Sequence, residues 1–249
     1  MILNKKEKFL QLPDALLFDT DNTLYAYDPA HTEAMEAVQH KLYLKFNIES
    51  TEFYDSFKKV KHEVKRHTAG TAASHSRLLY FQRLLETMGL GSQILIALDL
   101  EQTYWRAFLN KSELFENVRE LLDDIRLLGI PTAIVTDLTA QIQFRKIVYF
   151  GLDQCFDYVV TSEEAGFDKP DPAPFNLALE KLKPKGNCVW MIGDNPINDI
   201  QGAKESINAV TIQKLHTGIE KGIGASAPDA TFNNFKELRK LLTKLVGMK

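Results

Sequence analysis

Apolar residues recur every three or four positions between residues 28 and 111. The repeat defines four amphipathic segments, separated by short stretches of turn-forming residues. The apolar positions of the four segments are Met35, Val38, Leu42 and Phe46; Phe53, Phe57, Val60 and Val64; Leu78, Phe81, Leu85 and Met88; and Ile94, Leu98, Trp105 and Leu109. Four such helices joined by short loops predict a small helical bundle.

The remainder of the chain alternates between short apolar runs and helical stretches. The apolar runs are residues 15–18, 131–136, 157–161, 188–193, 209–213 and 230–232. The helical stretches are residues 112–129, 140–151, 172–183 and 196–206. Ser112 and Glu113 suit the start of the first of these helices. Strands that are apolar throughout and alternate with helices predict a parallel sheet with helices on both faces.

These patterns predict two domains of different class. We expect an α/β core, a doubly wound Rossmann-like parallel sheet, formed by residues 1–27 and 112–249. We expect residues 28–111 to form an inserted helical-bundle domain.

The composition is that of an ordinary globular protein and argues against a nucleic-acid-binding or membrane-spanning protein. The 249 residues are 45% hydrophobic and carry a net charge of −3, whereas a nucleic-acid-binding protein is expected to be basic. No run reaches the roughly 18 apolar residues of a membrane span, and the first residues do not resemble a signal peptide. Cys155 and Cys188 have no ligand spacing. We expect a cytoplasmic protein with reduced cysteines; a monomer and a homodimer both remain open.

Acidic residues follow several of the apolar runs. Asp19 and Asp21 end the first run, Asp137 follows residues 131–136, and Asp194 and then Asp199 follow residues 188–193. Any one of them taken alone is as well explained by a loop acid or a helix N-cap. In open parallel sheets, ligands bind at the carboxyl ends of the strands, so we expect these acids to converge at one edge.

Converging acids require a cation. Asp19 and Asp21 are two residues apart and point the same way in an extended chain. At about 6 Å and an effective dielectric constant of about 20, their charges repel by roughly 3 kcal/mol. Carboxylate oxygens without a cluster of histidines or cysteines favour Mg²⁺ over zinc. Mg²⁺ often binds substrate phosphate oxygens as well, which indicates phosphoryl chemistry.

Four motifs carry a resemblance to a known family. They are "FDTDNTL" (18–24), "AIVTD" (133–137), "GFDKPDPAPF" (166–175) and "MIGDNPINDIQGA" (191–203). In this order they resemble the motifs of the haloacid dehalogenase-like (HAD) hydrolase superfamily, most closely its phosphatases with a helical C1-type cap inserted after the first motif. The chain is also similar to the sub-group of house-cleaning nucleotidases and the N-acylneuraminate-9-phosphatase. This resemblance implies that residues 28–111 are the cap domain.

The resemblance also implies catalytic roles. Asp19 would be the nucleophile that forms an aspartyl-phosphate. Asp21 would be the general acid for the leaving group and then the base for water. Lys169 would neutralise charge on Asp19 and on the transferred group. Without the acids, Lys169 before Pro170 would be better explained as a solvated loop residue.

The phosphate-binding residues implied by the resemblance are Thr136, Lys169 and the backbone N–H groups of Thr20 and Asp137. The family commonly has Asn at the position of Asp137. If only the backbone N–H of this residue serves, the difference has no consequence. If its side chain turns inward, it adds a charge that opposes phosphate, so the orientation of the side chain stays open. Thr23 is interpreted as a hydroxyl that supports the turn after Asp21.

The implied metal ligands are the carboxylates of Asp19 and Asp194 and the backbone carbonyl of Asp21. Asp199 would lie behind them and orient Lys169 or a metal-bound water. In the cap, His75 and Arg77 are candidate substrate contacts, although a solvated surface position is the better explanation of each taken alone.

The sequence thus predicts a Mg²⁺-dependent phosphatase for a small phosphate monoester, a nucleotide or a sugar phosphate. A phosphomutase or phosphotransferase with the same nucleophile remains an alternative. A dehalogenase is disfavoured by Asp21, because dehalogenases of the family lack the second carboxylate. A non-catalytic member would be expected to have lost a motif, and all four are present.

Overall fold

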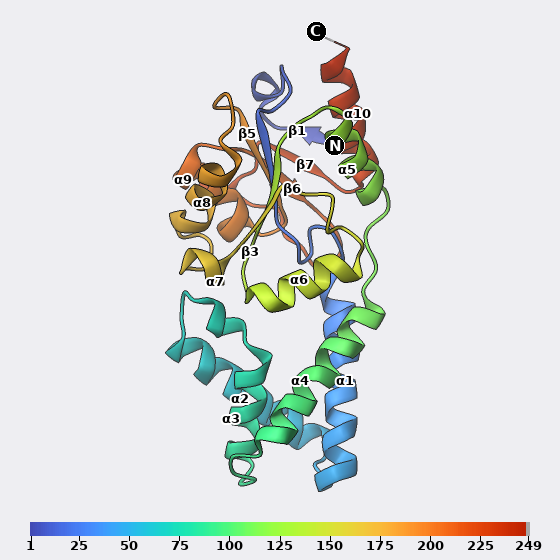
Figure 1. Ribbon diagram of the computed structural model, residues 1–249, viewed down its shortest axis with the longest axis vertical. Coiled ribbons are helices and arrows are strands. Elements are labelled where there is room, and N and C mark those ends of the chain that lie inside the picture. Colours follow the sequence, from blue (N-terminus) through green and yellow to red (C-terminus); the bar gives the residue numbers. More distant parts are fainter. Residues whose placement is uncertain (248–249) are drawn as a thin grey trace. The chain divides into compact units, whose positions relative to one another are not determined.

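The computed structural model describes residues 1–247, and the chain divides into two compact units. One unit contains Met1–Tyr25 and the chain from Glu113 onward, and the other contains Ala26–Ser112. The sequence analysis drew the boundaries after residues 27 and 111. Figure 1 shows the strands in the first unit and only helices in the second.

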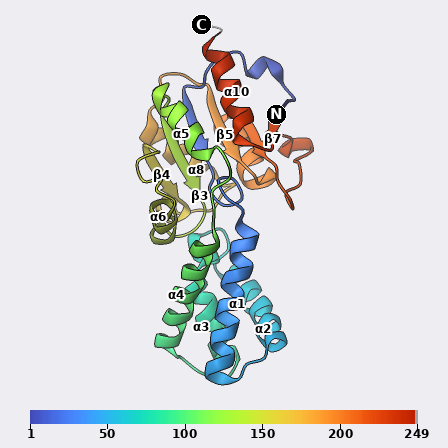
Figure 2. The ribbon, with the colours of Figure 1, turned by 90° about the vertical axis from the view of Figure 1, so that its right-hand side faces the viewer.

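The helical unit has four main helices and one short 3₁₀ turn. They are α1 (Tyr27–Phe46), α2 (Ser50–His67), η2 (Ala72–His75), α3 (Arg77–Thr87) and α4 (Ile94–Lys111). Helix α1 packs against α4, and α3 packs against both α2 and α4 (Figure 2). Phe53, Phe57, Val60 and Val64 form the buried stripe of α2, as their spacing predicts. Asn47, in the left-handed conformation, ends α1.

The other unit is built on a seven-stranded sheet in the order β1-β7-β6-β5-β2-β3-β4. The strands are β1 (Ile2–Leu3), β2 (Ala15–Phe18), β3 (Thr132–Thr136), β4 (Tyr158–Thr161), β5 (Val189–Gly193), β6 (Val210–Lys214) and β7 (Ala230–Phe232). All neighbouring pairs are parallel except β1 with β7. The predicted doubly wound α/β fold is therefore confirmed.

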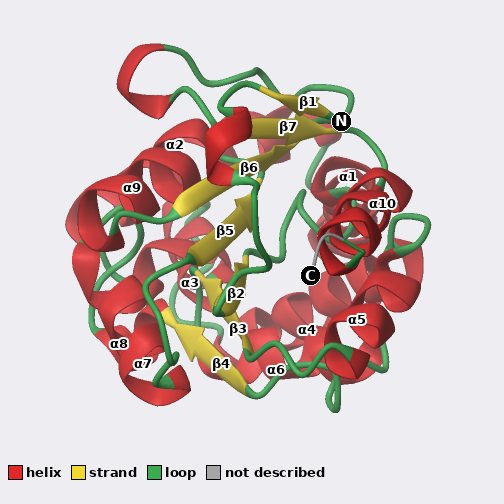
Figure 3. Cartoon of the chain, turned by 90° about the horizontal axis from the view of Figure 1, so that it is seen from above, coloured by secondary structure: helices red, strands yellow, loops and turns green. Residues whose placement is uncertain are grey.

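Helices cover both faces of this sheet. They are α5 (Val118–Leu127), α6 (Ala140–Tyr149), α7 (Ser162–Ala165), α8 (Pro172–Leu182), α9 (Gly202–Ile207) and α10 (Phe235–Val246), with 3₁₀ turns at Lys6–Lys8 and Gly224–Ser226 and a π-helical turn, η3, at Pro196–Gln201. Figures 1 and 3 show α8 and α9 on one face and α5 and α10 on the other.

Several local predictions differ from the structure. Ile94 and Leu98, expected on the apolar face of their helix, are 70% and 42% exposed, because α4 turns another face inward. The helix expected to begin at Ser112 begins at Val118 instead, and Ser112 ends α4, where its hydroxyl donates to the carbonyl of Phe108 (2.7 Å). The chain after it stays extended because the backbone N–H of Phe115 donates to the carbonyl of Leu24 (2.9 Å). The sequence analysis also missed β1, since two residues are too few to show a periodicity.

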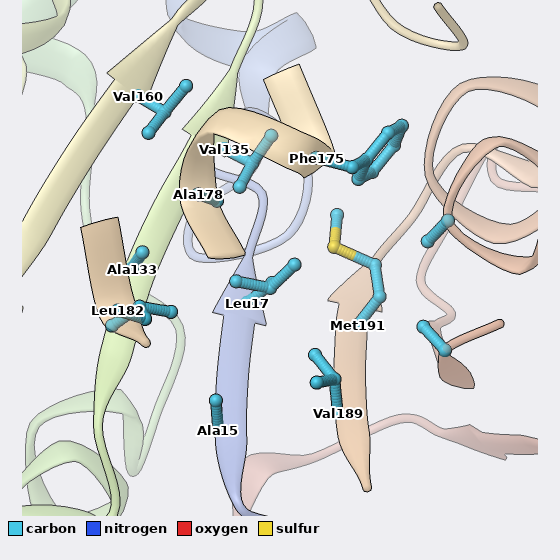
Figure 4. Close-up of a cluster of buried hydrophobic side chains, with 12 residues drawn as sticks. Ala15, Leu17, Ala133, Val135, Val160, Phe175, Ala178, Leu182, Val189 and Met191 are labelled. Carbon is cyan, nitrogen blue, oxygen red and sulfur yellow. The ribbon is translucent and has the colours of Figure 1, made fainter. Parts of the chain in front are cut away.

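The apolar core beneath α8 fixes the strand ends that carry the site. Phe175, Ala178 and Leu182 lie on one face of α8 and pack on side chains of β2, β3 and β5 (Figure 4). Those strand residues are Ala15, Leu17, Ala133, Val135, Val189 and Met191. Full burial of one large apolar side chain contributes about 1.5–3 kcal/mol, so this cluster holds the central strands firmly together.

None of the helices among residues 1–247 combines the length and the apolar character required to cross a bilayer.

Candidate active site

The strand order brings the ends of β2, β3 and β5 side by side. Strand β2 lies between β3 and β5, with Phe18 opposite Ile134 on one side and Ile192 on the other. This is the point where the chain changes direction across the sheet, the usual ligand position of doubly wound folds. Asp19 and Asp194, which directly follow β2 and β5, therefore lie with Thr136, the last residue of β3, at one edge of the sheet, where the sequence analysis expected the acids to converge.

Lys169 is the centre of a buried ion-pair cluster. Its Nζ lies 2.8 Å from Oδ1 of Asp19 and 2.6 Å from Oδ1 of Asp199, and it donates to the carbonyl of Val135 (3.0 Å). All three charged side chains are buried. Burial alone would lower the pKa of Lys169, but the adjacent carboxylates raise it well above its ordinary value. The ammonium group is thus firmly protonated and acts as a fixed positive charge.

Asp199 is held on both of its oxygens. Oδ1 faces Lys169, and Oδ2 accepts the backbone N–H of Asn195 (2.9 Å) at the start of η3. Gly193 makes this approach possible, because a Cβ there would lie 2.4 Å from Cβ of Asp199. Asp199 is therefore arranged to orient Lys169, whereas Asp194 keeps an oxygen directed at the rest of the cluster.

Thr23 contacts the acids directly. Its hydroxyl donates to Oδ2 of Asp19 (3.0 Å) and lies 3.4 Å from Oδ1 of Asp194. The left-handed conformation of Asn22, with φ of 61°, turns the chain so that Thr23 points back at the strand end. The interpretation of Thr23 as a turn residue alone was incomplete.

The carboxylates of Asp19, Asp194 and Asp199 form a cluster that suits a cation. Each offers an oxygen within 4.8 Å of the others. Burial, with the neighbouring negative charges, raises the pKa of Asp194 to about 9. Burial likewise raises the pKa of Asp19 to about 7. When all three carboxylates are ionised beside the ammonium group of Lys169, two negative charges remain, and a divalent cation would balance them.

The phosphate-binding candidates also lie at this edge. The hydroxyls of Thr20 and Thr136 are 2.8 Å apart and buried. Gln143 donates through Nε2 to the hydroxyl of Thr136 and to the carbonyl of Asp137, both at 2.8 Å. The Asp137 carboxylate accepts the backbone N–H of Lys169 (2.8 Å), which fixes the loop of that lysine. The side-chain orientation that the sequence left open is therefore toward Lys169.

Asp21 has a different partner from the other acids. Its two carboxylate oxygens lie 2.8 and 3.0 Å from Nζ of Lys146 on α6, and the Tyr25 hydroxyl donates to Oδ1. The Asp21 side chain is 33% exposed, and that of Lys146 is 2% exposed. Asp21 thus stands at the solvent side of the site, where a second carboxylate can reach a bound substrate.

Gln143 and Lys146 were missed by the sequence analysis. They are three residues apart and lie on the same face of α6, where both are buried. Polar residues at such positions are indistinguishable from a solvated helix face until the helix is placed. The one available signal was that they alternate with the buried Ile142 and Ile147.

The cap candidates, His75 and Arg77, lie together in the helical unit. Arg77 is 9% exposed and donates through Nη1 to the carbonyl of His75 (2.7 Å) and through Nη2 to the hydroxyl of Tyr27. Its guanidinium carbon lies 5.1–5.6 Å from the ring centroids of Tyr80, Tyr104 and Trp105. The structure thus places Arg77 in a buried aromatic cluster, and a substrate contact remains a prediction.

Comparison with known proteins identifies relatives across most of the chain. The sequence profile of the haloacid dehalogenase-like hydrolases matches residues 13–206. A ribulose-1,5-bisphosphate 5-phosphatase from Halopiger xanaduensis is 38% identical over 205 residues, which cover 81% of this chain and 83% of that protein.

Solved structures share the fold at lower identity. A HAD-hydrolase from Bacillus subtilis, YfnB, solved with magnesium bound, aligns with a TM-score of 0.69 and 21% identity, covering 94% of this chain and all of that one. A 2-haloacid dehalogenase from Pseudomonas syringae pv. Tomato aligns with a TM-score of 0.73 and 22% identity, covering 94% of this chain and 99% of that one. Similar folds thus support different reactions, and the side chains at the strand ends must distinguish them.

Proposed function

Because the chain belongs to the haloacid dehalogenase-like hydrolase family, we propose that it is a Mg²⁺-dependent phosphatase that acts through an aspartyl-phosphate. The observation that carries this proposal is the setting of Asp19. Its carboxylate lies between Lys169 and Thr23, beside Asp194, at the edge of the sheet where phosphoryl groups would bind.

In the first step, a carboxylate oxygen of Asp19 attacks phosphorus. The new P–O bond forms as the bond between phosphorus and the ester oxygen breaks, and Asp21 transfers a proton to the departing alkoxide. Lys169 and the hydroxyls of Thr20 and Thr136 stabilise the negative charge on the transferred group, since they are already in place and need not reorganise.

In the second step, water attacks the aspartyl-phosphate. The deprotonated Asp21 accepts the proton of the water, the bond between phosphorus and Asp19 breaks, and inorganic phosphate leaves. Asp21 regains its proton and Asp19 its free carboxylate, so the enzyme returns to its starting state. The two proposed roles fit the different surroundings of the two acids. Asp19 is buried beside Lys169, and Asp21 is partly exposed.

A divalent cation fits the donors that surround Asp19. The carboxylates of Asp19 and Asp194 and the backbone carbonyl of Asp21 would hold it, and Asp199 would position Lys169 beside it. Hard oxygen donors of this kind suit Mg²⁺. When bound, the ion would neutralise phosphoryl oxygens and the two excess negative charges of the cluster.

We propose a small sugar phosphate as the substrate, with nucleotides as the alternative class. The relative from Halopiger xanaduensis is named for a sugar bisphosphate, and it aligns over four-fifths of this chain. In the helical unit, Arg77 has only uncharged acceptors for Nη1 and Nη2, and its Nε has no hydrogen-bond partner among residues 1–247. A buried guanidinium in this state favours an anionic ligand, so we propose Arg77 and His75 as cap contacts for the substrate.

Two other reactions use the same nucleophile. A dehalogenase needs no general acid, and the placement of Asp21 on Lys146 and Tyr25 supports a reaction with a leaving oxygen. A phosphomutase would return the phosphoryl group to a second sugar hydroxyl rather than to water. Release of inorganic phosphate from a screen of phosphorylated sugars and nucleotides separates hydrolysis from this alternative.

The test of the proposal is the Asp19→Asn variant assayed with p-nitrophenyl phosphate and Mg²⁺. We expect kcat to fall by about 10⁴-fold or more, because the covalent route is lost. Removal of divalent ions with EDTA should abolish wild-type turnover, and added Mg²⁺ should restore it. Asp123→Asn, an exposed change on α5, serves as the control and should leave turnover unchanged. Retained turnover in Asp19→Asn would remove the proposed nucleophile.

A further inference from the structure

Lys146 is a buried lysine that the mechanism above does not use. Its side chain is 2% exposed, although it carries a charge and sits on a surface helix of the sheet unit. A buried ammonium group is strongly destabilising unless an opposite charge and hydrogen bonds compensate it. The ionised carboxylate of Asp21, the residue proposed as general acid and base, supplies an opposite charge to this ammonium group.

The contact is geometrically specific. Nζ of Lys146 lies within hydrogen-bond distance of both oxygens of Asp21, at 2.8 and 3.0 Å, so it fixes the plane of the carboxylate as well as its position. The Tyr25 hydroxyl donates to Oδ1 of the same group. Tyr25 is itself immobilised, because its ring is buried and lies 4.9 Å from the ring of Phe150 at the end of α6.

The same face of α6 also contacts Thr136. Gln143, one turn before Lys146, donates to the Thr136 hydroxyl (2.8 Å). A hydroxyl that accepts this bond directs its own proton elsewhere, to Thr20 or to a phosphoryl oxygen. One helix thus contacts both the proposed general acid and a proposed phosphate-binding hydroxyl.

We propose that Lys146 is a positioning residue for Asp21. It holds the carboxylate in the orientation from which the proton reaches the leaving oxygen, and it acts through Asp21 rather than on the phosphoryl group. This inference rests on the proposed phosphatase function. A general acid misplaced by about 1 Å can lower a rate by about 10²-fold, so the expected effect is large for a residue without substrate contact.

Leaving-group dependence distinguishes positioning from a structural role. The value of kcat/KM reports the steps up to departure of the leaving group. The alkoxide of ribulose 1,5-bisphosphate needs a proton in that step, whereas nitrophenolate leaves without one. In Lys146→Met we expect kcat/KM for the bisphosphate to fall by about 10–100-fold and that for p-nitrophenyl phosphate to fall by about 3-fold or less.

Two further variants control this experiment. Lys146→Arg keeps a donor for each Asp21 oxygen and should recover most of the loss on the bisphosphate. Arg145→Met removes a cation from the exposed face of the same helix and should change neither value. Equal losses on both substrates in Lys146→Met, or no rescue by Arg in a folded variant, would overturn the positioning role.

Crystal structures of the wild type and Lys146→Met separate this inference from the proposed function. If the wild type hydrolyses neither ester, or only one of them, the structures decide the question alone. A displaced or disordered Asp21 carboxylate in the variant supports positioning, and an unchanged one contradicts it. If Lys146→Met does not fold, the structure and the two kcat/KM values of Lys146→Gln take its place.

Discussion

The two units of the chain bury charge in opposite ways. The sheet unit gathers the carboxylates of Asp19, Asp194 and Asp199, and burial raises the pKa of Asp194 to about 9. The helical unit gathers bases around Arg77, where burial and the charges of Arg77 and Lys61 lower the pKa of His31 to about 4. Each cluster therefore has an excess of one sign, negative in the sheet unit and positive in the helical unit.

The acid cluster and the Arg77 cluster differ in how their excess charge is stabilised. The acids are held by hydrogen bonds from the Thr23 hydroxyl and the backbone N–H of Asn195 and by Lys169, so their arrangement persists and would accept a cation. The guanidinium of Arg77 is held by aromatic rings and uncharged acceptors, which stabilise a cation without neutralising it.

The largest expected effect, on both turnover and stability, follows removal of the positive charge of Lys169 from the acid cluster. Lys169→Met should lower kcat/KM for p-nitrophenyl phosphate by about 10³-fold, because transition-state charge loses its fixed partner. Without metal, it should also lower the free energy of unfolding by about 3–5 kcal/mol, since buried carboxylates lose their counter-ion. Chemical denaturation with and without Mg²⁺ measures the second effect, and Mg²⁺ should restore part of the stability.

Lys181→Met is the matched control for this prediction. Lys181 pairs with the exposed Glu164 at the surface, where an ion pair contributes about 0–1 kcal/mol. Equal destabilisation by the two changes would mean that Lys169 is not the counter-ion of a buried acid cluster.

The acid cluster was the part most predictable from sequence. Asp19 and Asp194 directly follow apolar runs, and the topology of a parallel sheet brings such positions to one edge. Asp19, Thr136 and Asp194 lie where this rule places them. The contact of Thr23 with Asp19 was missed because it depends on the left-handed turn at Asn22, which a sequence pattern does not specify.

The contacts made by helices were far less predictable. Lys146 reaches Asp21 across 125 positions of sequence, and its helical spacing equally suits a solvated face. Arg77 was predicted only as a candidate contact, and its burial among Tyr27, Tyr80 and Tyr104 depends on how four helices pack. Hydrophobic periodicity identified the helices themselves, but not which polar residues they enclose.

A smaller effect is expected from removal of the buried charge in the helical unit. Arg77→Met should raise KM for ribulose 1,5-bisphosphate by about 10-fold or more and leave KM for p-nitrophenyl phosphate nearly unchanged, if the guanidinium meets the sugar part of the substrate. It should also destabilise the protein by about 1–3 kcal/mol, because the Tyr27 hydroxyl and the His75 carbonyl lose their partner. Steady-state kinetics and thermal unfolding measure the two effects.

Arg83→Met tests whether the location of the charge matters. Arg83 lies on the same helix but pairs with Glu63 and Glu86 at the surface, so its loss should change neither KM nor the unfolding temperature. If Arg77→Met lowers stability without any change in KM for the bisphosphate, Arg77 is a packing residue and the cap contact must be sought elsewhere.

The smallest expected effect is on the pH dependence of folding stability, which has opposite signs in the two units. The pKa of His31, about 4 in the folded chain, lies below its ordinary value of 6.5. Between these values the unfolded chain binds more protons, so this residue makes stability fall as pH falls. Asp19 and Asp194, with their pKa values raised to about 7 and 9, make the metal-free protein lose stability as pH rises over the same range.

His31→Gln isolates the contribution of the helical unit, because it removes the titrating ring and keeps a polar partner for Tyr104, which His31 contacts at 2.7 Å. In EDTA, the unfolding temperature of the variant should rise relative to the wild type by a few degrees between pH 7.5 and 4.5. His40→Gln, on an exposed position of the same helix, should give a constant difference from the wild type. A constant difference for His31→Gln as well would mean that its ring is not held neutral by burial and the nearby cations, and the helical unit would then lack the positive excess that distinguishes it from the acid cluster.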